Sequence, residues 1–375
     1  MQSRQPRLNA RRQKLARQYA NLMRRFSFIR SSIIGIILLA LVFGGLSVRW
    51  SHLVPFPQPW ASALYFIILS FGFGIILIPI SYYQGFILPH RYHLSHQKLP
   101  GWLSDRAKAS TLSFFLGLAV VILFYWLLDK FPDTWWLWAG IILLLLSLLI
   151  TRLTSTLLLS IFFKLKPLAD RKLKRRLINL AKRAGAPILG VFTINLSSKS
   201  TTGNAMLAGL GRTRRIILTD TLLKKYTPDE IEVVLAHELG HHIHRDIPKL
   251  MAIQAAMVFL GLYLSNLVLR AGVVPFGFNG IADVATLPLL FLFIAVLGII
   301  TGPIINTYSR RVEAAADGAA LELTANRVAF ISALTRLTNQ NLSVANPGRW
   351  VELLYYDHPP YTKRVSLAKK YIIDR

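Results

Sequence analysis

The residues of this chain best suited to chemistry are His237, Glu238 and His241, which form the pattern HExxH. Two histidines four residues apart lie on one face of a helix, because a turn takes about 3.6 residues, and they can bind one zinc ion. Glu238 would then lie beside the open coordination position, where its carboxylate can accept a proton from water. The pattern therefore indicates a metallopeptidase, although so short a motif needs supporting context.

The helix that would carry the motif has a clear start. Thr227 is suited to the N-cap, Pro228 to the first helical position, and Glu230 completes a capping box. From there no helix-breaking residue occurs before Gly240, which costs about 1 kcal/mol in a helix interior. A glycine at this position predicts that another part of the chain approaches the helix closely beside the metal.

A catalytic zinc site normally has three protein ligands and a water molecule, so the two histidines leave one ligand to be found. The chain contains no cysteine, which excludes thiolate ligands and disulfide bonds. The candidates are the histidines and carboxylates that follow the motif: His242, His244, Asp246, Glu313, Asp317 and His358. Of these, His242 and His244 lie on the wrong faces of the motif helix, and Asp246 is too near its end.

Glu313 is the candidate that the rest of the chain favours as third ligand. Two further predicted membrane spans separate it from the motif, and an even number of crossings returns the chain to the same side. Asp317, four residues later, shares its helical face and suits a hydrogen bond to a ligating histidine. The alanines 314–316 between them indicate a helix that packs closely against the motif helix.

Most of the chain has the composition of a membrane protein. Hydrophobic residues make up 53% and charged residues 16%, against about 25% charged in soluble domains. Six apolar runs approach or exceed the ~20 residues that cross ~30 Å of hydrocarbon, at 31–48, 61–80, 109–128, 135–163, 250–269 and 286–306. A soluble helical core is disfavoured because residues 141–150 have no polar face. The sequence therefore predicts about six transmembrane helices.

The net charge of +27 follows this membrane topology. With six spans, 40 of the 44 Lys and Arg residues fall on one side: nine before residue 31, four within 81–108, seventeen within 164–249 and ten after 306. An excess of Lys and Arg marks the cytoplasmic side, so both termini and the motif are expected there. Topology and attraction to anionic lipid thus explain the charge, and no nucleic-acid partner is expected.

We expect three parts along the chain. Residues 1–30 form a basic cytoplasmic segment, either an amphipathic helix on the membrane surface or a disordered tail. Residues 31–163 form an N-terminal membrane domain of four transmembrane helices. Residues 164–375 form the peptidase domain, with the motif helix, the spans 250–269 and 286–306 and a C-terminal helical tail.

The peptidase domain should contain a small β-sheet beside its helices. It opens with a basic helix at 166–184, and strands are predicted at 191–196 and 215–220. The segment 201–211 between them suits a short strand with loops, which makes three strands with at least one edge available. The expected fold is therefore mainly α: a polytopic membrane protein with a cytoplasmic zincin-type metallopeptidase domain that contains a small β-sheet.

Four sequence blocks together resemble the M48 metallopeptidases, and most closely their Ste24/CAAX prenyl protease branch. The blocks are NAMLAGLGRTRRIILTDTLL at 204–223, HELGH at 237–241, RRVEAAAD at 310–317 and HPPYTKRV at 358–365. The loop 81–108 also resembles part of the amino-terminal membrane domain of that branch. The resemblance covers most of the chain, although the eukaryotic prenyl proteases have seven spans and six are predicted here.

The resemblance implies a zinc enzyme. One Zn²⁺ per chain would be held by His237, His241 and Glu313, with Glu238 as the general base. Water activated at the metal would attack the scissile carbonyl, and Glu238 would pass the proton to the leaving amine.

The resemblance also implies how a substrate would be held. Asn204 and Ala205 would belong to a strand that pairs with the substrate backbone at a sheet edge. His358 and Arg364 would lie near the site, where a positive charge can stabilise the developing oxyanion. Asp317 would support a ligating histidine from behind.

The sequence therefore predicts an integral-membrane zinc metalloendopeptidase that hydrolyses peptide bonds of membrane-associated or lipid-anchored proteins or peptides. Two alternatives stay open: quality-control degradation of damaged membrane proteins, and a non-catalytic membrane sensor or scaffold, which the intact Glu238 disfavours. The lack of cysteine and of an evident organelle signal indicates a multi-pass protein of a prokaryotic plasma membrane, with a cytoplasmic active site. The expected partners are peptide substrates and the bilayer; no oligomeric state and no prenyl group on the substrate is predicted.

Overall fold

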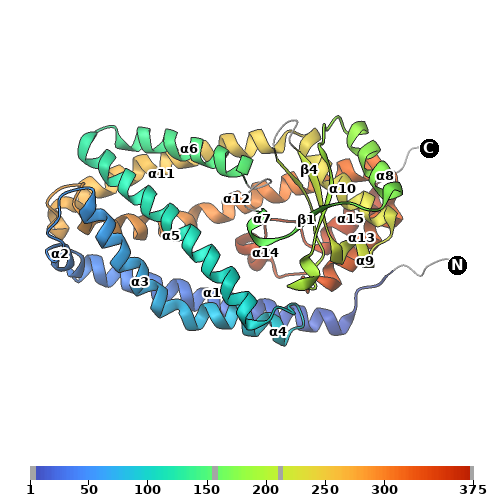
Figure 1. The fold of residues 1–375 in the computed structure, drawn as a ribbon, viewed down its shortest axis with the longest axis horizontal. Helices are drawn as coiled ribbons and strands as arrows, with labels where there is room; N and C mark the ends of the chain where they lie inside the picture. Colours follow the sequence, from blue (N-terminus) through green and yellow to red (C-terminus); the bar gives the residue numbers. More distant parts are fainter. Residues whose placement is uncertain (1–5, 154–158, 210–213, 372–375) are drawn as a thin grey trace.

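Six long apolar helices give the molecule its elongated shape (Figure 1). The computed structural model describes residues 6–153, 159–209 and 214–371. Within these residues, six helices are long and apolar enough to cross a membrane, which confirms the predicted number of spans. They are α1 (Ala10–Phe43), α3 (Trp60–Tyr82), α5 (Leu99–Lys130), α6 (Trp135–Leu153), α11 (Asp246–Phe276) and α12 (Leu287–Thr324).

Short elements connect these helices. At the end of the bundle far from the sheet lie α2 (Leu46–Ser51) and the turn η5 (Val284–Thr286), and at the opposite end α3 continues through the π-helical turn η1 (Tyr83–Ile87) into α4 (Leu88–Arg91) (Figure 1). Buried polar contacts hold the far end. Tyr65 Oη lies 2.6 Å from Ser47 Oγ, and Tyr125 Oη lies 2.9 Å from Thr286 Oγ1. These contacts hold the start of α12 against the other helices at this end of the bundle.

The first and last spans extend well beyond their apolar runs. The helix α1 begins at Ala10, where Asn9 caps it, and runs through residue 30 without a break. The described part of the basic segment is thus helical, and the boundary proposed at residue 30 coincides with no break in secondary structure. Likewise α12 continues from the membrane run to Thr324, so the predicted C-terminal tail starts inside the same helix. This continuity carries Glu313 rigidly from the bundle into the peptidase half.

The peptidase half contains a four-stranded sheet in the order β1-β2-β4-β3. The strands β1 and β2 pair antiparallel, β2 and β4 parallel, and β3 and β4 antiparallel. The strands are β1 (Leu165–Pro167), β2 (Gly190–Ile194), β3 (Ala205–Ala208) and β4 (Arg215–Thr219). The strand β3 therefore forms one edge of the sheet, in agreement with the prediction that at least one edge is available.

One strand was not predicted. The basic helix was expected at 166–184, but α8 spans Arg171–Arg183, because Asp170 caps it by accepting from the amides of Lys172 and Leu173. Pro167 lacks an amide proton for a continuing helix, and residues 165–167 instead pair with β2 as β1.

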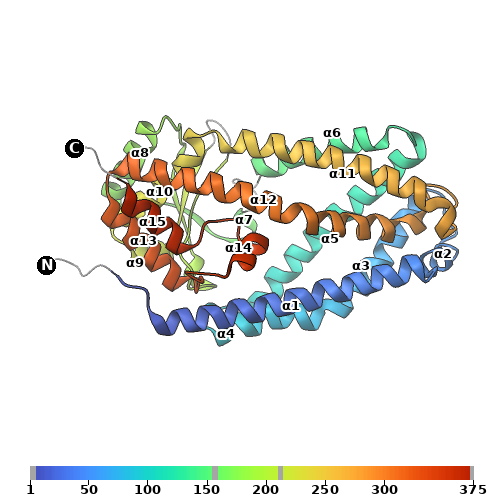
Figure 2. The ribbon, with the colours of Figure 1, turned by 180° about the vertical axis from the view of Figure 1, so that it is seen from behind.

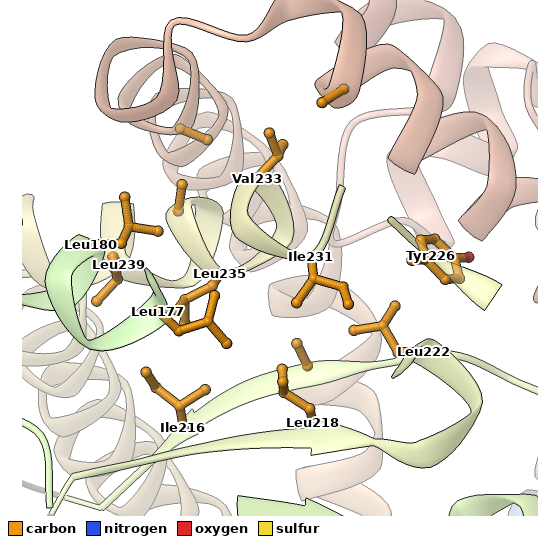
Figure 3. Close-up of a cluster of buried hydrophobic side chains, with 14 of the residues drawn as sticks. Leu177, Leu180, Ile216, Leu218, Leu222, Tyr226, Ile231, Val233, Leu235 and Leu239 are labelled. Carbon is orange, nitrogen blue, oxygen red and sulfur yellow. The ribbon is translucent and has the colours of Figure 1, made fainter. Parts of the chain in front are cut away.

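The remaining helices surround the sheet and the motif. They are α7 (Leu159–Phe162), η3 (Leu196–Ser198), α9 (Asp220–Lys225), α10 (Pro228–Ile243), α13 (Arg327–Gln340), α14 (Arg349–Tyr355) and α15 (Tyr361–Lys370). The core lies between β4, α8 and α10, where Leu177, Ile216 and Leu235 are fully buried (Figure 3). Burial of such side chains contributes roughly 1.5–3 kcal/mol each, which fixes the motif helix on the sheet.

Candidate metal centre

Two crossing helices bring the central residues together. The helix α10 starts with the predicted capping box of Thr227 and Glu230, and it presents His237 and His241 toward α12. At the crossing, a Cβ on Gly240 would lie 2.9 Å from the Cα and the carbonyl oxygen of Ala316. This confirms both the close approach predicted from Gly240 and the packing role of the alanines. Only glycine at this point permits the helices to approach so closely.

The three expected metal ligands meet at this crossing. One ligand atom from each of His237, His241 and Glu313 lies within 4.8 Å of the other two. The distance from His237 Nε2 to Glu313 Oε2 is 3.1 Å, and from His241 Nε2 to Glu313 Oε1 it is 3.5 Å. The structure therefore assembles two imidazoles and one carboxylate around a single point, a combination that zinc accepts.

Each histidine has a carboxylate partner on its other ring nitrogen. His237 Nδ1 lies 2.9 Å from Asp317 Oδ1, and His241 Nδ1 lies 2.9 Å from Asp246 Oδ2. When each imidazole is neutral, a carboxylate that accepts the Nδ1 proton leaves on Nε2 a lone pair that is directed toward Glu313 and available to a metal. Asp317 thus lies where the prediction put it.

The carboxylate of Glu313 supports the fit to a metal. Its Oε2 is buried, and among the described residues it has no hydrogen-bond partner, although His237 Nε2 is close. Burying a carboxylate oxygen without a partner is costly, and a divalent cation would remove that cost. Burial lowers the pKa of His237, but the Asp317 and Glu313 carboxylates outweigh it and raise this pKa to about 9. Protons therefore compete with a metal for this nitrogen.

Asp246 is a site residue that sequence reasoning missed. It was set aside as a ligand because it lies too near the end of the motif helix, and in the structure it is the partner of His241 instead. Arg245, between α10 and α11, has φ 53°, in the left-handed region. This sharp turn directs the Asp246 carboxylate back toward the motif helix. A ligating histidine normally donates its second ring N–H to a carboxylate, so a carboxylate five residues after His241 could have been predicted as its partner.

Arg364 lies at the site, where it lines a cavity together with His237 and Glu238. Its guanidinium makes two hydrogen bonds to the Asp317 carboxylate, one of them from Nε to Oδ2 at 2.7 Å. Burial lowers the pKa of Arg364, and the charges of Asp317 and Glu313 more than offset it, so the group stays protonated. Its charge is directed at Asp317, and the side chain also lines the cavity beside Glu238; the oxyanion contact expected for it stays a prediction.

This cavity of about 440 Å³ lies against α10, between this helix, α13 and the segment 356–361 that leads into α15. Glu238, Asn204 and His358 all line it, with His237 beside them. Burial raises the pKa of Glu238, against the lowering effect of the two histidines. A carboxylate with a raised pKa is a better proton acceptor near neutral pH.

The substrate-contact candidates differ in their exposure. Asn204 is exposed beside the edge strand β3, whereas the side chain of Ala205 is buried in the core beneath it. His358 Nε2 lies 3.3 Å from Glu313 Oε1, and its Nδ1 lies 2.8 Å from Asp357 Oδ1. The Asp357 contact raises the pKa of His358. Asp357 was not predicted as a site residue, because it belongs to no spacing pattern in the sequence.

Comparison with known proteins yields two family models that follow one another along the chain. Residues 167–372 match the model described as peptidase family M48, and residues 4–164 match that described as CAAX prenyl protease N-terminal, five membrane helices. Within the second range, four candidate spans lie among the described residues.

Individual proteins resemble the chain over most of its length. A protein of Bacillus subtilis named uncharacterized metalloprotease YhfN is 27% identical over 363 residues, covering 95% of this chain and 85% of that protein. CAAX prenyl protease 1 of Saccharomyces cerevisiae is 28% identical over 319 residues, covering 80% and 70%. The crystal structure of S. mikatae Ste24p superposes with a TM-score of 0.86 at 25% identity, covering 99% and 93%.

Proposed function

Because the chain belongs to peptidase family M48 and is a multi-pass membrane metalloprotease, we propose that it is a zinc endopeptidase that cuts membrane-associated or lipid-anchored proteins. The observation that carries this proposal is the convergence of His237, His241 and Glu313 at one point, with both histidines oriented by carboxylates. Zinc held there would polarise the scissile carbonyl and lower the pKa of water to about 7.

Glu238 is the proposed general base. It follows His237 directly on α10, lines the adjoining cavity, and has a raised pKa because it is buried. It would take the proton from the attacking water and give it to the leaving amine. His358, which borders the same cavity and contacts Glu313, would donate a hydrogen bond to the developing oxyanion.

The edge of β3 supports a mode of substrate binding. A peptide that adds to this edge would lie along the cavity, with the side chain of Asn204 beside it. Pairing through the backbone tolerates many sequences, so cleavage would depend on access to the site more than on a fixed motif. The relatives named CAAX prenyl proteases act, by their names, on one class of lipid-anchored protein; for this chain we propose the wider class.

The proposed site faces the cytoplasm. It lies at the end of the bundle where the basic helix α8 and the basic start of α1 are found (Figure 2), and Lys and Arg accumulate on the cytoplasmic side of membrane proteins. Protease accessibility in right-side-out and inside-out vesicles tests this orientation.

The decisive variant is Glu238→Gln. It should bind zinc as the wild type does and lose roughly a hundredfold to ten-thousandfold in kcat, while His237→Ala should lose the metal in elemental analysis. Glu322→Gln, at an exposed acid on α12, serves as the control. Full activity of Glu238→Gln would refute the mechanism.

The substrates can be identified by a second experiment. Mass spectrometry of membrane peptides from cells with wild-type or Glu238→Gln protein would identify both the substrates and their cut sites. Cleavage of one protein at a defined site would indicate maturation, whereas cleavage of many damaged proteins would indicate quality control.

A further inference from the structure

A second cavity, of about 850 Å³, opens between α3 and α5 in the membrane half, away from the metal centre. Its walls are largely aromatic and aliphatic, with Phe71, Ile75 and Phe115 among the residues that line it. All three side chains are more than 60% exposed. Beside them, a Cβ on Gly74 would meet nothing within 4 Å. The helices thus leave an open apolar groove, which a chain-like apolar ligand can enter.

Two arginines line the same groove at one end. Arg106 of α5 has Nη2 3.5 Å from Ser81 Oγ, near the end of α3. Gln84, one turn further along, donates to the carbonyl of Met23 and to Ser27 Oγ of α1, which brings the neighbouring Arg30 to the same level. The groove is therefore apolar along its length and cationic at one end.

Neither arginine has a counter-charge among the described residues. Among the residues that the structure describes, no carboxylate forms an ion pair with Arg30 or Arg106. Arg30 follows the exposed Phe28 and Ile29 in α1 and directly precedes the apolar run 31–48, so its charge needs a polar partner at the edge of the bilayer. An anion at the groove end would supply that partner.

We propose that this groove binds one anionic phospholipid, with its phosphate between Arg30 and Arg106 and its acyl chains along Phe71, Ile75 and Phe115. Charge complementarity favours an anionic over a zwitterionic headgroup, because the ammonium group of a zwitterionic headgroup cancels the phosphate charge and would be repelled by the two guanidinium groups. The bilayer supplies the ligand directly. The site goes beyond the proposed peptidase activity and does not depend on it.

Native mass spectrometry of the purified full chain tests the site with phosphatidylglycerol and phosphatidylcholine of identical acyl chains. The wild type should retain one phosphatidylglycerol at least tenfold more tightly than phosphatidylcholine, and inorganic phosphate should not displace it. The Arg30→Gln/Arg106→Gln double variant should lose most of this preference, by about tenfold or more. Gly74→Leu, which fills the groove, should weaken binding of both lipids.

The matched control is Arg25→Gln/Lys108→Gln, which removes two charges from the same two helices outside the groove. It should keep the preference of the wild type. Equal retention of the two lipids by the wild type, or an equal loss in the two double variants, would overturn the proposal. The wild-type comparison stands even where a variant fails to fold.

An independent observation concerns the loop that carries His358. One face of α12 holds this loop through Asn306, Arg310 and Glu313, spaced four and three residues apart. Asn306 Nδ2 donates to the Leu354 carbonyl at 3.0 Å. Arg310 Nη1 donates to the carbonyl oxygens of Glu352 at 3.0 Å and Tyr356 at 2.7 Å.

The far end of the same loop is also tied. Lys363 Nζ of α15 donates to Glu352 Oε1 at 2.6 Å, and Arg310 Nε lies 3.8 Å from the same oxygen. Arg310 and Glu352 are largely buried, whereas the His358 side chain is 51% exposed. His358 itself is thus held mainly through its backbone neighbours.

We infer that Arg310 is a positioning residue for His358, an inference that rests on the proposed function. Arg310 holds both ends of the turn from α14 into residues 356–358, and only a planar guanidinium can serve two carbonyls and Thr307 together. Without it, His358 would no longer be directed at Glu313 and the cavity.

A double-mutant cycle tests this, with a quenched-fluorescent peptide selected by the wild-type protein as substrate. Arg310→Gln should lower kcat about tenfold or more with zinc content and KM unchanged, and Arg310→Lys should restore little. In a His358→Ala background, Arg310→Gln should cost nothing further. Arg311→Gln, at the exposed neighbouring arginine, is the control.

Additive losses in the cycle, or loss of zinc from Arg310→Gln, would overturn the positioning role. The Glu238→Gln variant measured in parallel separates the two ideas. If that variant cleaves the peptide, the proposed function fails; if it is inactive while the Arg310 and His358 losses add, only the positioning role fails.

Discussion

The two histidines of the motif share one helix but are held by unequal surroundings. His237 is backed by Asp317 of α12, and Asp317 in turn binds Arg364 of α15. His241 is backed by Asp246 alone, five residues further along the chain. The His237 side chain is 12% exposed and that of His241 is 20% exposed. We call the first group, His237 with Asp317 and Arg364 on three helices, the distant arm of the site. The second group, His241 with Asp246 across one turn, is the local arm.

This difference separates two tasks within one site. The local arm of His241 forms as soon as α10 and the turn at Arg245 form. The arm of His237 forms only when α12 and α15 have docked, so it couples the metal site to the packing of the whole peptidase half. A variant in the distant arm should therefore change stability and metal binding together, whereas one in the local arm should change metal binding alone.

The largest effect is expected for Asp317→Asn. This change leaves the buried Arg364 charge without its partner, which costs about 3 kcal/mol or more, and it weakens support for His237, which costs about tenfold to a hundredfold in zinc affinity. Thermal unfolding in detergent and zinc titration should both report the loss. Glu322→Gln removes an exposed acid from the same helix and should change neither. An unchanged unfolding temperature in Asp317→Asn would contradict the coupling.

The pH dependence of zinc binding should show the same asymmetry. The pKa of His237 is raised from its ordinary value to about 9, so its protonated form stabilises the metal-free fold. That contribution is complete below about pH 6.5 and is lost as the pH rises through about 9. Zinc must displace this proton, so its affinity should rise about tenfold per pH unit from about pH 7 to about pH 9.

Asp317→Asn should flatten this rise, because it removes the carboxylate that holds the proton on His237. Asp246→Asn should leave the slope as in the wild type. Competition with a chelator, corrected for the chelator's own protonation, measures both. A wild-type affinity that is flat across this range would show that protons do not compete at His237.

A smaller and more local effect is expected for Asp246→Asn. Zinc affinity should fall about tenfold, because His241 loses the partner that fixes its ring and tautomer. The unfolding temperature should change little, since within the described part of the chain no Lys or Arg forms an ion pair with Asp246 as Arg364 does with Asp317. A large loss of stability would mean that the local arm also supports the fold.

The same asymmetry explains what sequence could foresee. The meeting of α10 and α12 followed from Gly240, the alanine run and an even number of spans, each of which is a rule of period or topology. Asp246 was missed because its direction depends on the left-handed φ of Arg245, which no spacing reports. Arg364 was placed near the site, but its guanidinium contacts Asp317 because a buried carboxylate attracts it, a preference that a motif does not record. The strand β1 was hidden in a basic segment that resembled a helix.

The sharpest test of the two arms is expected from Gly240→Ala. The added methyl group would lie 2.9 Å from Ala316 Cα and carbonyl oxygen, so α12 must move away from α10. Overpacking costs about 1–3 kcal/mol, and the better helix propensity of alanine returns up to about 1 kcal/mol. Because the atoms that the added methyl group would meet belong to the backbone of α12 and cannot swing away, the net loss of stability should be about 2 kcal/mol.

That movement should act on one arm only. Asp317 and Glu313 travel with α12, so His237 loses support, whereas the turn that carries Asp246 stays with α10. In Gly240→Ala the rise of zinc affinity with pH should therefore become shallower, while adding Asp246→Asn should still cost its full tenfold. Gly318→Ala is the matched control on α12, because a Cβ there meets nothing within 4 Å, and it should leave both properties unchanged. If Gly240→Ala instead abolishes the contribution of Asp246, the two arms are one unit, and the distinction between a distant and a local arm does not hold.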